Sequence, residues 1–204
     1  LETDVVYFIK DIMKSFDNLA ANNKIGMNLV SEEEVTNLWI DQGNFDKIIF
    51  NILSNAFKYT PENGSVSIHI GKAQKNEGIL ASSIKEYVEF IIENTGSRID
   101  EKYLDKLFDR FFQTDIKDAK VGSGVGLNLA KMLVDLHHGE ISAFNNEDGV
   151  SFRVTIPVGC SHLSAEEMTK PTNHKDLYTK STLRFEDHSS SREDVTHNIT
   201  ETTS

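Results

Sequence analysis

Along residues 1–158 the spacing of apolar residues switches repeatedly between the period of a helix and the alternation of a strand. The stretches with helical spacing are 4–20, 45–60, 99–112 and 125–138. The stretches typical of strands are 24–30, 34–41, 65–70, 87–94, 140–145 and 149–158. Strands that alternate with amphipathic helices bury their apolar faces when the helices cover one side of a sheet. The sequence therefore predicts an α/β fold, a two-layer α/β sandwich in which a mixed sheet is covered by helices on one face.

Two local features are predicted within this pattern. The stretches 24–30 and 34–41 flank the acidic turn 31–34, and this order favours a hairpin of two short strands. Asn44 stands just before the helix 45–60, where an asparagine side chain can accept a hydrogen bond from a free backbone amide. We therefore expect Asn44 to cap this helix.

The composition changes after Pro157. Residues 159–204 are rich in Ser, Thr, Asp, Glu and His, with few large apolar residues, so this segment cannot bury enough surface to fold alone. We predict a domain over 1–158 and a flexible linker or tail over 159–204. The net charge of -11 would repel phosphates, so we expect neither nucleic-acid binding nor direct membrane contact. The single cysteine, Cys160, cannot form an internal disulfide, which favours a reducing compartment.

The stretch "FNILSNAFKYT", residues 50–60, places polar side chains beside the apolar stripe of a helix. At about 100° per residue, Asn51, Asn55 and Lys58 fall on one flank. Amide oxygens suit a hard cation such as Mg²⁺, which shares its ligands with phosphates, and lysine adds a point charge. An isolated pair of asparagines at this spacing is more often a solvated helix face.

The stretch "GSGVGL", residues 122–127, places three alternate glycines at the start of a helix. Free backbone amides and the helix dipole attract phosphate at such a position. The stretch is not a P-loop, since neither Gly-Lys-Ser nor Gly-Lys-Thr follows, and it does not match the dinucleotide fingerprint. A glycine-rich loop alone is weak support for nucleotide binding.

Two further stretches complete the pattern. In "ENTGSRI", residues 93–99, Asn94 follows a strand and could contact the edge of a base, while Gly96 allows the chain to turn away. In "FDRFF", residues 108–112, the simplest interpretation is a helix that packs aromatic rings.

In this order the four stretches resemble the N, G1, F and G2 boxes of the sensor histidine kinase catalytic domain, the ATP-binding unit of the GHKL superfamily. The resemblance covers residues 1–158 and implies the Bergerat-type ATP-binding fold, with ATP and Mg²⁺ as ligands. The stretches "FDRFFQ" and "GSGVGLNLAKMLVDLHHGEI" look most like hybrid two-component sensors of Bacteroides-type bacteria. That likeness implies a receiver domain downstream and a place on the cytoplasmic side of an inner-membrane sensor protein.

The resemblance also implies roles for single residues. Asn55 matches the magnesium-coordinating asparagine, and Asn51 matches the polar residue one turn earlier. Lys58 and Tyr59 match the pair that approaches phosphate and base, and Asn51 and Lys58 are the implied catalytic residues. The remaining implied nucleotide-binding residues are Asn94, Gly96, Ile99, Gly122, Ser123, Gly124, Val125, Gly126 and Leu127. Residues 113–123 match the mobile lid.

Three positions depart from the family pattern. Asn94 stands where the family usually has an aspartate on the adenine amino group, and Arg98 replaces the second glycine of the G1 box. Gln113 stands where many relatives have an arginine able to reach the γ-phosphate, a role that Lys117 or Lys120 could take over. Each departure could weaken nucleotide binding.

The implied function is transfer of the γ-phosphoryl group of Mg-ATP to a histidine on a separate dimerisation domain. Asn51 cannot act as a general base at neutral pH, so hydrolysis should be slow. The alternative is a GHKL scaffold or slow ATPase that does not phosphorylate histidine.

None of the seven histidines matches the phosphoacceptor. His137 and His138 are expected at the end of the last helix, where a cation suits the helix dipole. The acceptor helices are therefore expected to belong to a separate part of the parent protein, and the fragment is expected to be inactive alone.

Overall fold

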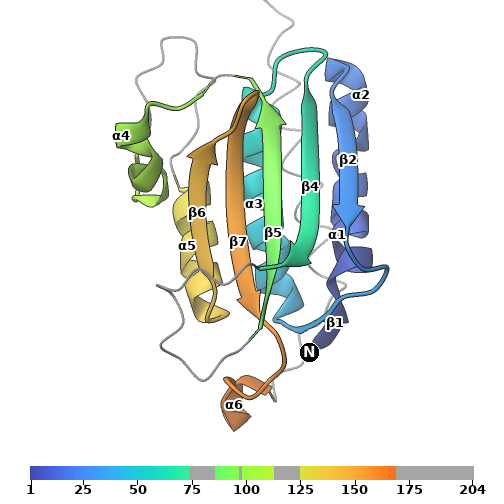
Figure 1. Ribbon diagram of the computed structural model, residues 1–204, viewed down its shortest axis with the longest axis vertical. Coiled ribbons are helices and arrows are strands. Elements are labelled where there is room, and N and C mark those ends of the chain that lie inside the picture. Colours follow the sequence, from blue (N-terminus) through green and yellow to red (C-terminus); the bar gives the residue numbers. More distant parts are fainter. Residues whose placement is uncertain (74–85, 97, 113–124, 169–204) are drawn as a thin grey trace, which may run out of the picture. The chain divides into compact units, whose positions relative to one another are not determined.

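The computed structural model describes residues 1–73, 86–96, 98–112 and 125–168, all within the compact unit Leu1–Thr172. Within these residues the main sheet has five strands in the spatial order β2, β4, β5, β7, β6 (Figure 1). The β2–β4 pair is parallel and the other pairs are antiparallel, which confirms the predicted mixed sheet. The strands are β2 Gly26–Ser31, β4 Ser65–Lys72, β5 Tyr87–Thr95, β6 Glu140–Asn145 and β7 Gly149–Pro157.

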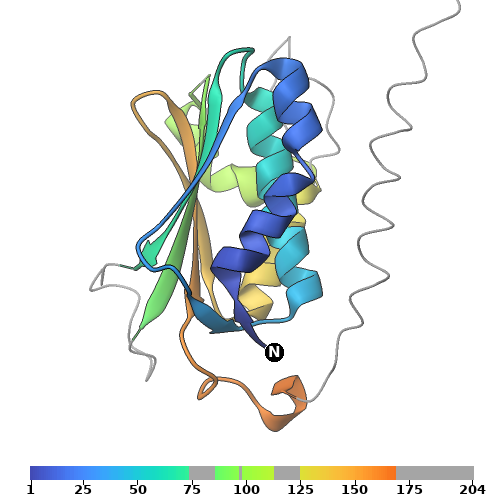
Figure 2. The same cartoon turned by 90° about the vertical axis from the view of Figure 1, so that its right-hand side faces the viewer.

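Helices lie together on one face of this sheet (Figure 2). They are α1 Val5–Lys14, α2 Asp17–Asn23, α3 Gln42–Tyr59 and α5 Gly126–Leu136. Fully buried side chains of the helices and of the inward-facing strand positions form one core between the two layers. The predicted two-layer α/β sandwich is therefore confirmed.

The predicted hairpin over 24–30 and 34–41 is wrong. β2 pairs in parallel with β4 in the main sheet. β3, Asn37–Trp39, instead pairs antiparallel with β1, Glu2–Asp4, in a separate two-stranded sheet.

Burial explains why these two strands separate. Met27 and Leu29 of β2 pack against the main core, so β2 must lie in the main sheet. A parallel partner for β2 requires a long crossover, which α3 provides before β4 begins. Leu38 of β3 is fully buried and pairs with Thr3 of β1. The N-terminal strand therefore pairs with β3 and not with the main sheet.

The first predicted helix is split in two by a break before α2. Phe16, at the break, is fully buried, and its ring centroid lies 5.1 Å from the centroids of Phe50 and Phe57. The break therefore turns an aromatic ring into the core, where it packs against α3.

The cap predicted for α3 is also wrong. α3 begins at Gln42, and the side chain of Asp41 accepts a hydrogen bond from the Asn44 backbone amide at 2.9 Å. Asn44 lies inside the first turn, since the apolar pattern that begins at Phe45 starts one turn after the backbone does.

The helix predicted over 99–112 is much shorter in the structure. α4 spans Glu101–Leu104 and is followed by the 3₁₀ turn η1, Asp105–Phe108. Phe108 is buried, whereas Phe111 is exposed and has a φ of 65°, which no helix accommodates.

Beyond β7 the described chain turns and forms α6, Ala165–Met168. The rest of the predicted tail, residues 169–204, lies outside the described residues. The domain boundary at residue 158 therefore stays a prediction.

The sequence led us to expect His137 at the end of the last helix, where a cation suits the helix dipole. His137 is buried, and its Nδ1 lies 2.7 Å from the Leu133 carbonyl oxygen. Its Nε2 accepts a hydrogen bond from the Asp41 backbone amide at 3.2 Å. One nitrogen faces an acceptor and the other faces a donor, so this geometry requires the neutral ring. His137 therefore joins the end of α5 to the residue that caps α3.

We expect His137→Ala to lower the free energy of unfolding by about 2–3 kcal/mol, because it creates a cavity and leaves the Asp41 amide without an acceptor. Urea denaturation measures the change. The matched control is His69→Ala, since the side chain of His69 is 44% exposed. The control should cost less than about 1 kcal/mol. Equal losses in the two variants would contradict the structural role of His137.

Candidate functional site

The C-terminal half of α3 carries the polar flank predicted from the sequence. Asn51, Asn55 and Lys58 are half-buried, whereas Ile52, Leu53 and Ala56, which lie between them in the sequence, are fully buried. The flank therefore runs beside the apolar stripe and is accessible from outside.

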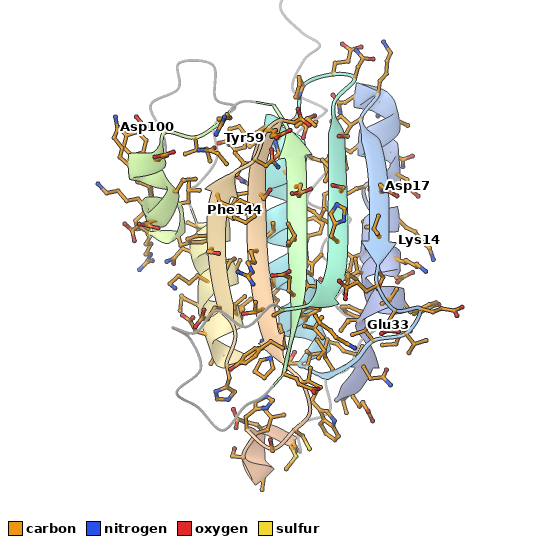
Figure 3. All side chains as sticks on the ribbon, viewed as in Figure 1. Lys14, Asp17, Glu33, Tyr59, Asp100 and Phe144 are labelled. Atoms are coloured by element: carbon orange, nitrogen blue, oxygen red, sulfur yellow. The ribbon has the colours of Figure 1, made fainter. Side chains whose placement is uncertain are left out.

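Hydrogen bonds hold two of these side chains. Asn51 Nδ2 donates to the Lys47 carbonyl oxygen at 2.7 Å. Lys58 Nζ donates to Tyr59 Oη at 3.0 Å and lies 4.7 Å from the centroid of the Tyr59 ring. Tyr59 is 37% exposed at the end of the sheet toward which β5 runs (Figure 3).

The end of β5 turns against the end of α3 at Gly96. Gly96 has a φ of 144°, and a methyl group there would lie 2.7 Å from the Tyr59 carbonyl oxygen. Only glycine fits such a backbone approach. The structure thus brings the G1 stretch into contact with the end of the N stretch.

Asn94 lies just before this turn and faces the helix layer. It follows Phe90 and Ile92 on the same side of β5 and is only 4% exposed. Its Nδ2 donates to the Thr95 carbonyl oxygen at 3.3 Å, near the upper limit for a hydrogen bond. A buried amide held this weakly can exchange its bond for one to a ligand.

The start of α5 lies against the middle of α3. A methyl group at Gly126 would lie 2.8 Å from Asn51 Oδ1. Leu127 packs against the main core, and Val125 is 37% exposed. The structure therefore places the start of the G2 helix beside the N stretch.

Several predicted site residues lie outside the described residues. They are Gly122, Ser123, Gly124, the lid 113–123 and, within it, Gln113, Lys117 and Lys120. Arg98 is described and is exposed.

Ile99 is held by a residue that the sequence did not single out. Its backbone amide donates to Asn145 Oδ1 at 2.9 Å, and Asn145 Nδ2 donates to its carbonyl oxygen at 2.7 Å. The asparagine side chain thus takes the place of a paired strand. No spacing signal in the sequence marks this contact, which joins the last residue of β6 to the G1 stretch.

A second missed group is the turn before β7. Asn146 Oδ1 accepts from the Gly149 amide at 2.6 Å, and the Asp148 carbonyl oxygen accepts from the Gly96 amide at 2.9 Å. A methyl group at Gly149 would lie 2.1 Å from the Asn94 carbonyl oxygen. The glycine in "NEDG" was a usable signal, because a glycine at a strand start often marks close backbone contact.

At the edge of this region Asp100 precedes α4 and caps its start. The side chain and the backbone amide of Lys102 both bond to its carboxylate and hold the pKa of Asp100 below its usual range. Asp100 therefore stays ionised beside the site.

The donor set fits a magnesium ion only if phosphates share it. Among the described residues no group of three or more His, Cys, Asp or Glu side chains could hold a metal. Mg²⁺ usually keeps several waters and takes one or two protein oxygens together with phosphates. The amide oxygen of Asn55, with Lys58 one turn further along, fits this mode.

No described helix is both long enough and apolar enough to cross a membrane.

Sequence comparisons relate this chain to known proteins. Residues 40–159 match the family described as histidine kinase-, DNA gyrase B- and HSP90-like ATPase, a range that includes every predicted site residue. Histidine kinase P4 of Formosa agariphila is 31% identical over 91% of this chain, which spans 13% of that protein.

Solved structures show the same fold. The catalytic domain of histidine kinase ThkA has a TM-score of 0.65 and 25% identity, over 77% of this chain and 94% of that domain. Full-length ShkA in complex with AMPPNP has a TM-score of 0.62 and 20% identity, over 77% of this chain and 30% of that protein. The chain belongs to the family of histidine kinase-, DNA gyrase B- and HSP90-like ATPases and is homologous to the catalytic domains of sensor histidine kinases.

Proposed function

We propose that this chain binds Mg-ATP and transfers its γ-phosphoryl group to a histidine on a separate dimerisation domain. The observation that carries the proposal is the convergence of three stretches of the chain. α3 approaches the turn at Gly96 through the Tyr59 carbonyl oxygen at its end, and the start of α5, at Gly126, through the side chain of Asn51 near its middle. Nucleotide binding needs base, metal and phosphate contacts at such a junction.

The position of each site residue indicates which part of Mg-ATP it would contact. Asn94, buried at the end of β5, contacts the base, with Gly96 and Ile99 shaping the same turn. Asn55 supplies an oxygen to Mg²⁺, which neutralises phosphate charge when bound. Lys58 supplies a positive charge to the phosphates, and Tyr59, whose hydroxyl accepts from Lys58, keeps it in place. The loop 122–126 offers backbone amides to the same phosphates.

The transfer step exchanges one bond for another. A lone pair of an imidazole nitrogen attacks the γ-phosphorus, the bond to the β–γ bridging oxygen breaks, and ADP leaves with that oxygen. Positioning and charge neutralisation supply most of the catalysis in such reactions. The chain therefore needs no general base of its own.

Attack by water is disfavoured at this site. Asn51, at the position that would activate water in hydrolysing relatives, carries an amide whose Nδ2 already donates to Lys47. An amide cannot take a proton from water at neutral pH. The second candidate function, a slow ATPase or a scaffold that only binds nucleotide, differs by the absence of transfer.

The described histidines are poorly placed to accept the group. His137 is buried, and His138 and His162 lie together, with ring centroids 5.4 Å apart, at the end of α5. That end is roughly 16 Å from the start of the helix. His69 lies on the face of the sheet opposite the helices, since it alternates with the buried Ile68 and Ile70. The other three histidines, His174, His188 and His197, lie outside the described residues. We propose that the acceptor belongs to another part of the full-length protein.

The partners follow from this proposal. We propose that the full-length protein supplies dimerisation helices with the acceptor histidine, a receiver domain downstream and a membrane-anchored sensor part, with this domain on the cytoplasmic side. The chain spans 13% of histidine kinase P4, which leaves room for such parts. Residues 159–204 then form the linker toward the receiver.

In the absence of the dimerisation helices, the chain should bind ATP in a Mg²⁺-dependent manner and release phosphate well below the roughly 1 s⁻¹ at the slow end of kinase turnover. Calorimetry and phosphate release measure the two quantities. Adding the dimerisation helices of the full-length kinase should move label from [γ-³²P]ATP to their histidine. Binding without any transfer would favour the scaffold. Rapid release that Asn51→Ala abolishes would favour an ATPase.

Asn55→Ala should remove most of the Mg²⁺-dependent gain in ATP affinity, about tenfold, because the variant lacks the oxygen proposed for the metal. Titrations with and without Mg²⁺ measure this gain. The matched control is Asn22→Ala, an exposed asparagine on α2, which should leave both affinities unchanged. An undiminished Mg²⁺ effect in Asn55→Ala would rule out the metal assignment.

Asn94→Asp should raise the ratio of ATP to GTP affinity about fivefold. A carboxylate only accepts hydrogen bonds, so it suits the adenine amino group and repels the guanine carbonyl, whereas an amide serves both. The variant should also melt at a lower temperature without nucleotide, because the site is 4% exposed and would bury a charge. Competition binding measures the ratio, with Asn94→Ala as the control that weakens both nucleotides alike. An unchanged ratio would mean that Asn94 does not contact the base.

A further inference from the structure

The side chain of Asn51 lies between two helices with both ends of its amide in contact with the protein. Its Nδ2 donates to the Lys47 carbonyl oxygen at 2.7 Å, one turn earlier on α3. Its Oδ1 lies beside the first residue of α5, where a methyl group on Gly126 would approach it to 2.8 Å. The same methyl group would lie 3.6 Å from Asn51 Cγ and 3.8 Å from its Cβ. The whole side chain therefore fills the space beside Gly126.

Among the described residues, no side chain caps the start of α5. Val125 occupies the cap position and makes no side-chain hydrogen bond to the helix, and the first turn carries no acidic residue. Ser, Thr, Asp and Asn side chains are the preferred caps at this end of a helix. For the described part of α5, the contact that positions its start is the one with α3 at Gly126.

The hydrogen bond to the Lys47 carbonyl oxygen restrains the side chain of Asn51 beside Gly126. An asparagine amide would normally swing away from an approaching methyl group at little cost. Here such a movement breaks a 2.7 Å hydrogen bond. The amide therefore resists displacement, and α5 seats against it.

We infer that Asn51 is a positioning residue that sets where α5 begins, and with it the end of the glycine loop at Gly126. It acts through Gly126 and not as a base or a nucleophile. The functional part rests on the proposed function, because the loop matters to affinity only if it binds the phosphates of ATP. The packing part stands without it.

A double-mutant cycle tests the inference with Asn51→Ala, Gly126→Ala and the pair together. Gly126→Ala should weaken ATP binding about tenfold, because the new methyl group displaces Asn51 or α5. In the Asn51→Ala background the same methyl group has room and should cost less than about twofold. Calorimetric titration with Mg-ATP measures all four affinities. If the two single losses simply multiply in the double variant, the positioning role is wrong.

Stability gives a second readout that needs no nucleotide. Alanine is a better helix former than glycine, and the φ of Gly126 is not in the left-handed region, so Gly126→Ala alone should stabilise an unobstructed helix. We expect it to lower the urea midpoint in the native background and to raise it in the Asn51→Ala background. A rise of the urea midpoint in both backgrounds would show that Asn51 does not obstruct a methyl group at Gly126. If the unaltered chain does not bind ATP, the proposed function is wrong. The opposite shifts of the urea midpoint in the two backgrounds would still test the contact between Asn51 and Gly126.

The matched control is Gly71 on β4. A methyl group there would also meet a polar side chain, at 2.7 Å from Glu32 Oε1. Gly71 pairs with Glu89, whereas Val66 at the other end of β4 pairs with Asn94, so Gly71 is far along the strand from the site. The cycle of Gly71→Ala with Glu32→Ala should leave ATP affinity unchanged within twofold at all four corners. A tenfold loss in this control cycle would show that any such clash weakens binding, and the special role of Asn51 would be withdrawn.

Discussion

The chain reverses at Gly96 against the Tyr59 carbonyl oxygen, which a methyl group at Gly96 would approach to 2.7 Å. A second close approach joins Gly149 to the Asn94 carbonyl oxygen, at 2.1 Å for the same test group. Through these two contacts the backbones at the end of α3, the end of β5 and the start of β7 lie directly against one another. Side chains larger than hydrogen would force the three elements apart. The positions of Asn55 and Asn94 relative to each other thus depend on two glycines that contribute no functional group.

Much of this arrangement could be predicted from the sequence, because it depends on local period. The apolar stripe of α3 predicts a helix, and the alternation of apolar residues along β5 predicts a strand. The turn of about 100° per residue in a helix places Asn51 and Asn55 on one flank. The pairing of β2 could not be predicted, because a half-buried strand carries no mark of its distant partner. The cap at Asp41 was missed because Asn44 has the same preference for that position. The clamp of Asn145 on Ile99 joins two residues 46 positions apart, and no local rule reaches that far.

The two ends of α5 are fixed against α3 by different means. At its C-terminal end the buried ring of His137 accepts a hydrogen bond from the backbone amide of Asp41, the residue that caps α3. At its N-terminal end the contact is steric, between Asn51 and Gly126. A helix held at both ends gives the glycine loop a fixed anchor on one side.

Hydrogen exchange with and without Mg-ATP tests most directly whether the three stretches form one nucleotide site. Saturating nucleotide should slow exchange together in residues 50–60, 94–96 and 125–129, at a common midpoint of titration. Exchange in β2 and α1, on the other side of the fold, should stay the same. Slowing confined to one of the three stretches, or equal slowing across the whole sheet, would contradict a shared site.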